Sequence, residues 1–443
     1  MSIPSSPPSC PMSAGHARSS RWWARTTAGT KTPGGVPVYP EDLYSEAAIR
    51  DPLPHYAAMR ALGPVIWLPK QNLYALPRYG EVKSALGDDD TFRSHQGVAL
   101  NPISRSVGKD SLLMTDDPAH ASRRKLQAHR LTPRALRTLH TQIEELAEQT
   151  VLAGLANGRV DGVADIALKL PLGIVPDLVG WPQRGREHLV ERAGATFDML
   201  GPLNKRALRS LPKTAAMLHF VHRLARRRDV LPGSMSHDVL QGIEQGTIKQ
   251  SQLPAVFIDY LAPSIDTTAS AIAAALWLFG QNPDQWRLLR AEPDRVPNAV
   301  NEIVRLESPV RAFGRRAERD VEIGGTRIPA GSRVLVMFAS ANRDERVWTD
   351  PDRFDIERDA SGHVGFGYGT HGCAGQGLAR LETQAILRSL LRHVDRIDVD
   401  GTPERAVNNV IHRFERLPLR LVAKSSSAPP DRSAAVSIPR GQR

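Results

Sequence analysis

The residues most able to do chemistry lie in one short segment near the C-terminal end of the chain. This segment contains one cysteine, Cys373, which lies among Gly369, Gly372 and Gly375. Glycine allows turn conformations that other residues avoid, so backbone N–H groups can point at the sulfur and stabilise a thiolate. A helix predicted over 377–382 would begin beside the sulfur and favour the anion further. A thiolate held in this way is a strong axial ligand for haem iron.

The types and spacing of the residues around this cysteine form a pattern. Five positions within ten residues carry it: Phe366, Gly369, His371, Cys373 and Gly375. An inert cysteine in a glycine-rich hairpin is the alternative, and the number of matching positions favours the ligand. The segment resembles the haem-binding signature of the cytochrome P450 family, F-x-x-G-x-[H/R]-x-C-x-G. The resemblance implies haem b as cofactor and Cys373 as the ligand of its iron.

A second candidate for chemistry lies in a long apolar segment, 252–281, which its pattern predicts to be helical. Pro263 removes one helical hydrogen bond and is expected to kink the helix there. The residues that follow resemble the oxygen-activation motif of the family, [A/G]-G-x-[D/E]-T-[T/S], but Pro263 and Ser264 replace its two small residues. The resemblance implies that Asp266 relays protons and that Thr267 holds a hydrogen bond where oxygen is activated. A kinked core helix with polar caps is the alternative.

Several basic residues could hold the carboxylates of a haem. His120 and Arg124 are four residues apart, so on a helix they share one face and could grip one anion. A solvated basic helix face is the alternative. The segment resembles the family pattern D-P-x-H-x-x-x-R, which implies contacts from both residues to a haem propionate. The resemblance adds Arg315, whose register is ambiguous because Arg316 is adjacent. It also adds three residues of the cysteine segment as cofactor-binding residues: Phe366, His371 and Gly375.

An E-x-x-R pair, Glu302 and Arg305, lies on an amphipathic segment predicted to be a helix. Its position resembles the K helix of the family. The resemblance implies a buried hydrogen-bonded network of Glu302, Arg305 and Arg353 that sets the core geometry. A second E-x-x-R pair, Glu292 and Arg295, contains Pro293 and is interpreted as accidental.

Candidate walls of a substrate pocket come from four parts of the chain. They are Val98 and Leu100 in a long loop over 92–114, Phe197 and Leu200 in a segment that resembles the family's lid, Ala262 and Pro263, and Val310 and Phe313. Plain core packing is an equal alternative for the lid segment. Such aliphatic and aromatic walls suit a small apolar or aromatic ligand. The loop weakly resembles that of bacterial members that hydroxylate or O-demethylate methoxyaromatics, but Gln96 stands where an arginine clamp would be sought.

The fold class predicted from these patterns is mainly α with a smaller β region. The family implies a triangular helical prism with haem between the long kinked helix and the cysteine loop. No repeat or linker interrupts the middle of the 443-residue chain, so we expect one domain over 36–423, with flexible tails at 1–35 and 424–443. Hairpin strands are expected at 65–68 and 73–76, and further strands at 321–337 and 410–421.

Composition narrows the function classes. The chain has 41% hydrophobic and 24% charged residues and a net charge of +11, much of it in the predicted tails, so no nucleic-acid partner is expected. The two cysteines, Cys10 and Cys373, imply no disulfide framework. We expect neither a signal peptide nor a membrane partner, because no apolar stretch reaches the roughly 20 residues that span a bilayer. A cytoplasmic location follows as an expectation.

The resemblance implies a monooxygenase that inserts one oxygen atom from O2 into a small organic substrate. Electrons would come from NADH or NADPH through a separate ferredoxin and ferredoxin reductase. A basic patch of Arg123, Arg124, Lys125 and Arg130 is a candidate docking face for that ferredoxin. A peroxide-driven peroxygenase and a haem-binding sensor without turnover remain as alternatives.

Overall fold

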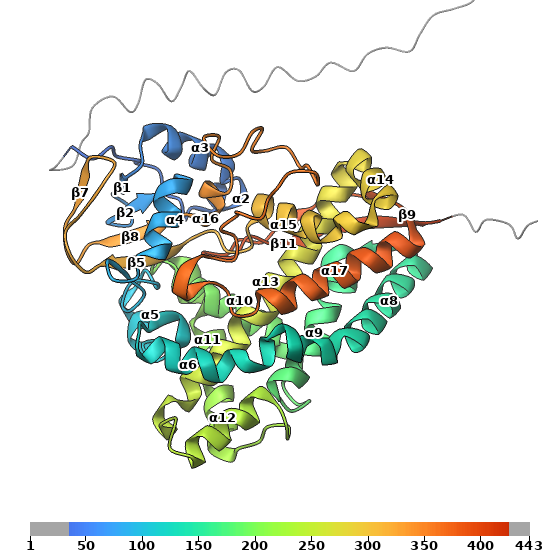
Figure 1. Cartoon of the computed structure of the whole chain (residues 1–443), viewed down its shortest axis with the longest axis horizontal. Coiled ribbons are helices and arrows are strands. Elements are labelled where there is room, and N and C mark those ends of the chain that lie inside the picture. Colours follow the sequence, from blue (N-terminus) through green and yellow to red (C-terminus); the bar gives the residue numbers. More distant parts are fainter. Residues whose placement is uncertain (1–34, 425–443) are drawn as a thin grey trace, which may run out of the picture.

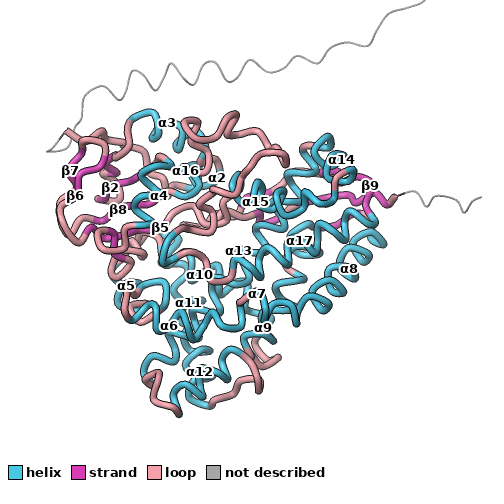
Figure 2. The backbone as a smooth tube through the Cα atoms, viewed as in Figure 1, coloured by secondary structure: helices cyan, strands magenta, loops and turns pink. Residues whose placement is uncertain are grey.

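The computed structural model describes residues 35–424, except the side chains of 126, 127, 261 and 262. The described chain has a roughly triangular outline in which helices predominate; the five-stranded sheet lies toward one corner, at the left of Figure 2, and β9 lies near the opposite corner, beside α14. The predicted tails and Cys10 lie outside the described residues, apart from residues 35 and 424. Ala262, which is predicted to be a wall of the substrate pocket, is among the residues whose side chains are not described.

The largest sheet has five strands in the order β1-β2-β8-β5-β3. Neighbouring strands are antiparallel except β2 and β8, which are parallel. Its strands are β1 (Ile66–Leu68), β2 (Leu73–Leu76), β3 (Phe92–Arg93), β5 (Phe313–Ala317) and β8 (Arg333–Val336). The predicted hairpin around residues 69–72 is confirmed, because β1 and β2 pair antiparallel. Apolar side chains alternate along these strands into two clusters, one on each face of the sheet.

Three smaller sheets complete the β region. The first has three strands in the order β4 (Arg159–Asp161), β12 (Pro418–Ala423) and β9 (Val394–Val399). The second is a hairpin of β6 (Val321–Ile323) and β7 (Thr326–Ile328), and the third pairs β10 (Glu404–Arg405) with β11 (Phe414–Arg416). The C-terminal strands predicted over 410–421 are thus present, and β12 pairs with both β4 and β9.

Helices make up most of the described chain (Figure 1). The N-terminal half contains α2 (Glu46–Arg50), α3 (Leu53–Leu62), α4 (Tyr79–Gly87), α5 (Pro102–Val107), α6 (Ala119–Ala128), α7 (Pro133–Leu136), α8 (His140–Asn157), α9 (Lys169–Val179), α10 (Leu189–Leu200) and α11 (Lys205–Arg227). The C-terminal half contains α12 (Met235–Glu244), α13 (Leu253–Gln281), α14 (Pro283–Ala291), α15 (Val296–Glu307), α16 (Phe338–Ala341) and α17 (Gln376–His393).

The central helix is α13, which crosses the middle of the molecule and packs against α9, α10, α11, α15 and α17 (Figure 1). It runs through Pro263 as one helix, so the expected kink does not interrupt it. Among the described residues, 250–281 is the one helical stretch apolar and long enough to cross a membrane by length and composition. Within the fold, 75% of its apolar window is buried, which is the environment of a core helix.

The segment 92–114 differs from its predicted irregular form. It contains strand β3, helix α5 and a 3₁₀ turn, η1 (Leu112–Met114). Asn101 explains the unpredicted helix, because its side chain caps α5 by accepting a hydrogen bond from the Ser104 backbone, and Pro102 follows at the first helical position.

Candidate functional site

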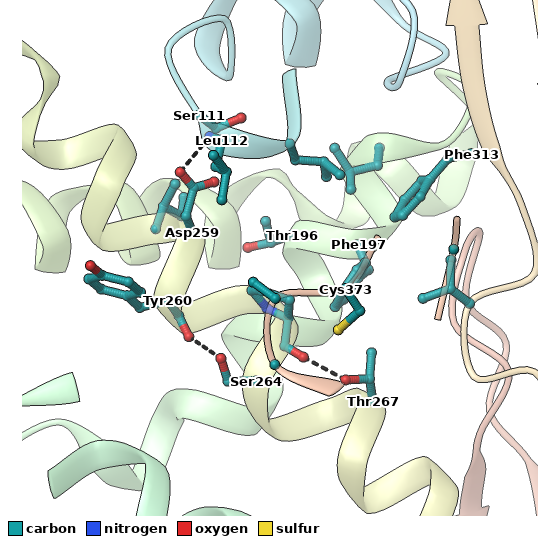
Figure 3. A pocket seen from close by; sticks show the side chains of 18 of the residues that line it. Ser111, Leu112, Thr196, Phe197, Asp259, Tyr260, Ser264, Thr267, Phe313 and Cys373 are labelled. Atoms are coloured by element: carbon teal, nitrogen blue, oxygen red, sulfur yellow. Dashed lines mark hydrogen bonds between the residues drawn. The ribbon is translucent and has the colours of Figure 1, made fainter. Parts of the chain in front are cut away.

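An apolar cavity of about 450 Å³ lies between α13, the helices α10 and α11, and the loop 366–375 that contains Cys373, which we call the cysteine loop. Its lining includes Cys373 from the loop, Thr267 from α13, Phe197 from α10 and Phe313 from β5 (Figure 3). Most of the remaining lining side chains are aliphatic. Pockets of this size and composition hold small organic ligands and cofactors.

The cysteine loop is a tight turn closed by backbone hydrogen bonds. The Cys373 amide donates to the Phe366 carbonyl at 2.7 Å, and Gly372 donates to Gly369 at 3.0 Å. Gly369 needs to be glycine, because its φ is +68° and a Cβ there would lie 2.4 Å from the Leu86 carbonyl oxygen. Gly372 and Gly375 have negative φ, so of the three glycines expected to need special turns only Gly369 does.

Helix α17 begins at Gln376, directly after the loop, as predicted. Burial raises the pKa of the Cys373 thiol, while backbone hydrogen bonds from Gly375 and Gln376 and the cations Arg124 and Arg380 oppose that rise. Without a metal the burial effect is the larger, so the helix start does not by itself give a low pKa. A metal ion bound to the sulfur would lower the thiol pKa further, because a coordinating thiol is deprotonated.

Four basic side chains meet at one end of the cavity, and all four line it: His120, Arg124, Arg315 and His371. The rings of His120 and His371 lie 4.2 Å apart between centroids, and Arg124 donates to the Thr370 carbonyl at 3.2 Å. Burial, with the neighbouring His371 and Arg124, lowers the pKa of His120 to about 4. The structure thus brings together four residues that are up to 251 positions apart in the sequence.

Two acids border this basic end, because Asp116 lies 3.7 Å from Nε2 of His371 and Asp117 lies 3.5 Å from Nδ1 of His120. Arg315 is buried, and the hydrogen bond described for its side chain goes to the neighbouring Gly314 carbonyl. Burial lowers the pKa of its guanidinium to about 10. The Nδ1 atom of His120 is buried without a hydrogen-bond partner. Arg316, by contrast, does not line the cavity and lies 4.0 Å from Glu318.

A haem fits these features. The buried Arg315 guanidinium and the half-buried Arg124 need acceptors, and the Nδ1 atom of His120 has no hydrogen-bond partner among the described residues; the two propionates would supply these contacts. Phe366 and Gly375 also line the cavity, and a Cβ built at Gly375 meets no atom within 4 Å. Cys373 would hold the iron, and the four basic side chains would hold the carboxylates.

The two predicted catalytic residues take different places. Thr267 lines the cavity, and its hydroxyl donates to the Pro263 carbonyl at 2.6 Å, which leaves the Oγ1 lone pairs free to accept (Figure 3). Asp266 is buried and does not line the cavity. Its carboxylate lies 3.3 Å from Nε of Arg413. Burial raises the pKa of Asp266, although Arg413 opposes the rise.

The predicted structural network has one different member. Glu302 and Arg305 are fully buried, and Arg305 donates two hydrogen bonds, of 2.7 and 2.8 Å, to the carboxylate. The side chain that joins them is Arg358, which donates to Glu302 at 3.2 Å. The side chain of Arg353 is not part of the network, because this residue is exposed in a turn and offers only its carbonyl to Arg305.

The substrate candidates divide into two groups. Phe197, Leu200, Pro263, Val310 and Phe313 line the cavity. Val98 and Leu100 do not, so their prediction as walls is wrong. Their backbones are tied to neighbouring elements, with Gly314 donating to Val98 and Leu100 donating to Leu200, and their side chains pack into the clusters behind the wall.

Other lining residues were not predicted. They come from α5, η1, α9 and α11 and include Ile103, Val107, Leu112, Leu113, Val175, Leu178, Leu211 and Leu218. Ile103 and Val107 are four residues apart on one face of α5, and this spacing was the available signal in a segment predicted to be irregular.

Most of the predicted ferredoxin-docking patch is engaged within the chain. Arg123 bonds to the Asp110 carbonyl and Arg130 to the Asp238 carboxylate, and Arg124 lines the cavity. Lys125 is the exposed member. Docking of a ferredoxin on this patch stays a prediction, and within the chain three of its four cations already have contacts or line the cavity.

Comparison with known proteins places this architecture. The cytochrome P450 family model matches residues 169–410. The chain is 37% identical over 391 residues to a protein named cytochrome P450 CYP199A2 of Rhodopseudomonas palustris, covering 87% of this chain and 95% of that protein. It is 32% identical to a β-dihydromenaquinone-9 omega-hydroxylase of Mycobacterium bovis, covering 85% and 77% of the two chains.

Solved structures agree with the sequence comparison. A Mycobacterium marinum cytochrome P450, CYP268A2, solved with pseudoionone, superposes with a TM-score of 0.78 at 29% identity and covers 87% of this chain and 99% of its own. The predicted fold class is confirmed. The chain belongs to the cytochrome P450 family, whose members bind haem through a cysteine thiolate, and it is an oxidoreductase of the oxygen-incorporating kind.

Proposed function

We propose that the protein is an O2-dependent monooxygenase that uses haem b and inserts one oxygen atom into a small, uncharged apolar or aromatic substrate. The observation that carries the proposal is that Cys373 and Thr267 line one mainly apolar cavity. Haem held by a thiolate supplies the oxygen-activating chemistry when it is bound.

The cavity walls support an uncharged substrate. Apart from His120, Arg124, Arg315 and His371 at the basic end, the residues described as lining the cavity include no lysine or arginine, and the one acid among them is Asp259. Asp259 accepts a hydrogen bond from the Leu112 amide at 2.6 Å (Figure 3). A substrate carboxylate would therefore lack a cationic partner here, which matches the missing arginine clamp at Gln96.

The substrate would share the cavity with the haem, because residues of the basic end and the cysteine loop line the same cavity. Relatives named for apolar substrates include the menaquinone hydroxylase and a steroid C26-monooxygenase of Rhodococcus jostii, 30% identical over 397 residues. We propose hydroxylation or O-demethylation of a smaller apolar or aromatic molecule.

Thr267 and Asp266 would control protons. The Thr267 hydroxyl proton is held by the Pro263 carbonyl, so Oγ1 can accept a hydrogen bond in the cavity. Asp266 is one residue away and linked through Arg413 to the exposed Glu415, at 3.0 Å from Arg413. Arg413 does not itself pass protons, but the ion pair places the Asp266 carboxyl on the solvent side of Thr267, which supports Asp266 as the carrier of protons toward Thr267.

Electrons would come from NADH or NADPH through a ferredoxin and its reductase. On α6 the exposed Lys125 remains available for an acidic ferredoxin, next to Arg124 in the cavity wall. Charge reversal of Lys125 should slow ferredoxin-driven reduction. Charge reversal of Arg123 or Arg130 would instead break ion pairs that hold the fold together, so it tests docking poorly.

Two other functions predict different results. A peroxide-driven peroxygenase would turn over with hydrogen peroxide and not with a reductase chain. A haem sensor would bind ligands without product. The presence of Asp266 and Thr267 favours the monooxygenase, because neither alternative needs a proton relay.

The proposal is tested by adding small neutral aromatic and aliphatic compounds to the purified ferric protein. A substrate that displaces the water bound to iron should shift the Soret absorption, and that compound should then be oxidised with NAD(P)H, a ferredoxin and its reductase. Binding confined to benzoate-like anions would contradict the uncharged substrate. A shift without product under any electron supply would favour the sensor.

A further inference from the structure

Two polar residues lie together in the otherwise apolar wall of the cavity, away from the cysteine. Ser111 directly precedes turn η1, Asp259 lies on α13, and both line the cavity. The amide of Leu112, the residue after Ser111, donates to the Asp259 carboxylate at 2.6 Å and so holds η1 against α13. Figure 3 shows Ser111 and Asp259 on one side of the pocket, with Cys373 and Thr267 on the other. We call Ser111 and Asp259 the polar end.

The hydroxyl of Ser111 lacks the hydrogen bond that a buried hydroxyl needs. Ser111 is 5% exposed, and its Oγ atom has no partner among the described residues. Elsewhere in the lining, the hydroxyls of Thr196 and Ser264 each donate to a carbonyl one turn back on their own helix. Leaving a buried hydroxyl without an acceptor destabilises a fold. Ser111 therefore indicates a place where a ligand supplies the missing acceptor.

Asp259 contributes the complementary half of the polar end. It is the one acid among the residues described as lining the cavity. Support of η1 explains its bond with the Leu112 amide, but a carboxylate can accept about four hydrogen bonds. Support of the turn also leaves the Ser111 hydroxyl unexplained. A ligand group that both donates and accepts a hydrogen bond matches the two residues together.

The position of the polar end sets which part of a substrate would react. Asp259 and Thr267 are eight residues apart on α13, so about 12 Å of helix axis separates them. Both residues line the cavity. A substrate whose polar group lies at Asp259 would therefore present its opposite end near Thr267 and Cys373. This separation suits a polar group joined to the reacting carbon by a ring or a short chain.

We propose that Ser111 and Asp259 bind a hydroxyl group of the substrate, so that the enzyme selects neutral phenols or alcohols and oxidises them at the end remote from that hydroxyl. The substrate O–H would donate to Asp259, and its oxygen would accept from Ser111. An ammonium group cannot accept a hydrogen bond, and a carboxylate would face the Asp259 carboxylate. This substrate class deepens the proposed monooxygenase function and depends on it. One atom of O2 would enter a C–H bond at the remote end, and the other would leave as water with two protons and two electrons from NAD(P)H.

The test compares the binding of 4-alkylphenols, with ethyl to hexyl chains, and of their methyl ethers to the ferric holoprotein. The Soret shift measures both affinities. An ether keeps the oxygen but loses the O–H donor, so each phenol that binds should bind at least about tenfold more tightly than its ether. The matching 4-alkylbenzoate should bind more weakly than the phenol.

Three results in the wild-type protein would overturn the proposal. The first is equal binding of phenols and ethers, and the second is no binding of any phenol in the series. The third is tighter binding of a 4-alkylbenzoate or of a (4-alkylphenyl)trimethylammonium ion than of the phenol, because charge would then be recognised in place of a hydroxyl. These comparisons need no variant, so they stand even where a substitution prevents folding.

Variants assign the preference to the two residues. Asp259→Asn keeps an oxygen for the Leu112 amide but removes the carboxylate, so the preference for phenol over ether should fall to about twofold or less. Ser111→Ala should weaken phenol and ether alike, by about threefold or more, because both oxygens accept. Thr196→Val is the matched control, because the Thr196 hydroxyl lines the cavity but already donates to the Arg192 carbonyl. An unchanged preference in Asp259→Asn, or its equal loss in Thr196→Val, would overturn the assignment.

Product analysis separates this proposal from the monooxygenase function on which it depends. With NAD(P)H, a ferredoxin and its reductase, wild-type protein should oxidise the alkyl chain of the phenol and not the ring carbons beside the hydroxyl. Oxidation beside the hydroxyl would contradict the orientation. Selective binding of phenols without product would support the polar end and contradict the monooxygenase. Equal binding and equal oxidation of phenols and ethers would leave the monooxygenase intact and overturn the polar end.

Discussion

The Asp266 carboxylate lies 3.3 Å from Nε of Arg413, and this ion pair joins the central helix α13 to the segment before β11. The exposure of the two side chains is 2% and 20%, and Arg413 also contacts the exposed Glu415. The acid next to Thr267 thus faces a route to solvent and not the cavity. The proposed role of Asp266 as a proton carrier requires either a rotation of its side chain or a water between Asp266 and Thr267.

Asp266→Asn should slow product formation about a hundredfold, because the amide cannot carry a proton. Substrate binding should persist, because Asp266 does not line the cavity. The two results are measured by steady-state product formation and by the substrate-induced Soret shift. Arg413→Lys keeps the cation and should retain most of the activity. An Asp266→Asn variant with full activity would exclude the relay.

Thr267→Ala should uncouple oxygen consumption from product formation. Its Oγ1 is a hydrogen-bond acceptor in the cavity wall, which Ser264 and Thr268 of α13 also line. Oxygen consumption should continue while hydrogen peroxide replaces much of the product. Ser264→Ala is the matched control, because the Ser264 hydroxyl makes the same kind of bond, to the Tyr260 carbonyl one turn back. Equal uncoupling in both variants would show a general disturbance of the helix.

Glu302→Gln should destabilise the fold by about 3 to 5 kcal/mol, because it leaves the buried Arg305 without its counter-charge. Thermal unfolding of the holoprotein measures this effect. Glu292→Gln changes the second E-x-x-R pair, whose members are half-exposed, and should have little effect on the unfolding temperature. Similar losses in the two variants would refute the assignment of the network to Glu302.

Glu382 makes stability depend on pH in an unusual direction. Its side chain on α17 is fully buried and neither oxygen has a hydrogen-bond partner among the described residues. Burial raises the pKa of its carboxyl from 4.5 to about 8. The folded protein therefore binds a proton that the unfolded chain releases between these values, so stability falls as pH rises through this interval, by up to about 1.4 kcal/mol per pH unit.

Glu382→Gln removes that proton. The variant should therefore gain unfolding temperature relative to wild type at pH 8, and the gain should shrink toward pH 5. Thermal unfolding across this range gives the difference directly. Parallel curves for the two proteins would show that Glu382 is not neutral in the folded state.

The sequence motifs predicted which residues line the cavity near the cysteine better than the apolar patterns predicted its walls. Cys373, Thr267 and the basic residues 120, 124, 315 and 371 line one cavity, and they could be named from the sequence because a cofactor demands particular residue types at fixed spacing. Helix α13 and the β1–β2 hairpin followed from hydrophobic period. Each of these signals is local, or repeats a pattern that is already known.

What the sequence did not predict depends on distant contacts. Arg358, and not Arg353, places its side chain on Glu302, and this choice depends on how the segment that contains both arginines folds against α15. Asp266 turns toward Arg413, 147 residues away. The α5 side of the cavity was not predicted, because a helix of six residues is too short for its hydrophobic periodicity to be recognised in the sequence.

The measurement that tests the central claim most directly compares wild-type protein with Cys373→Ala. The haem-thiolate assignment predicts that reduced wild-type protein with carbon monoxide shows the long-wavelength Soret band of a thiolate-ligated haem, and that the variant loses this band. A variant whose reduced carbon-monoxide complex absorbed like wild type would contradict Cys373 as the iron ligand, and with it the proposed monooxygenase.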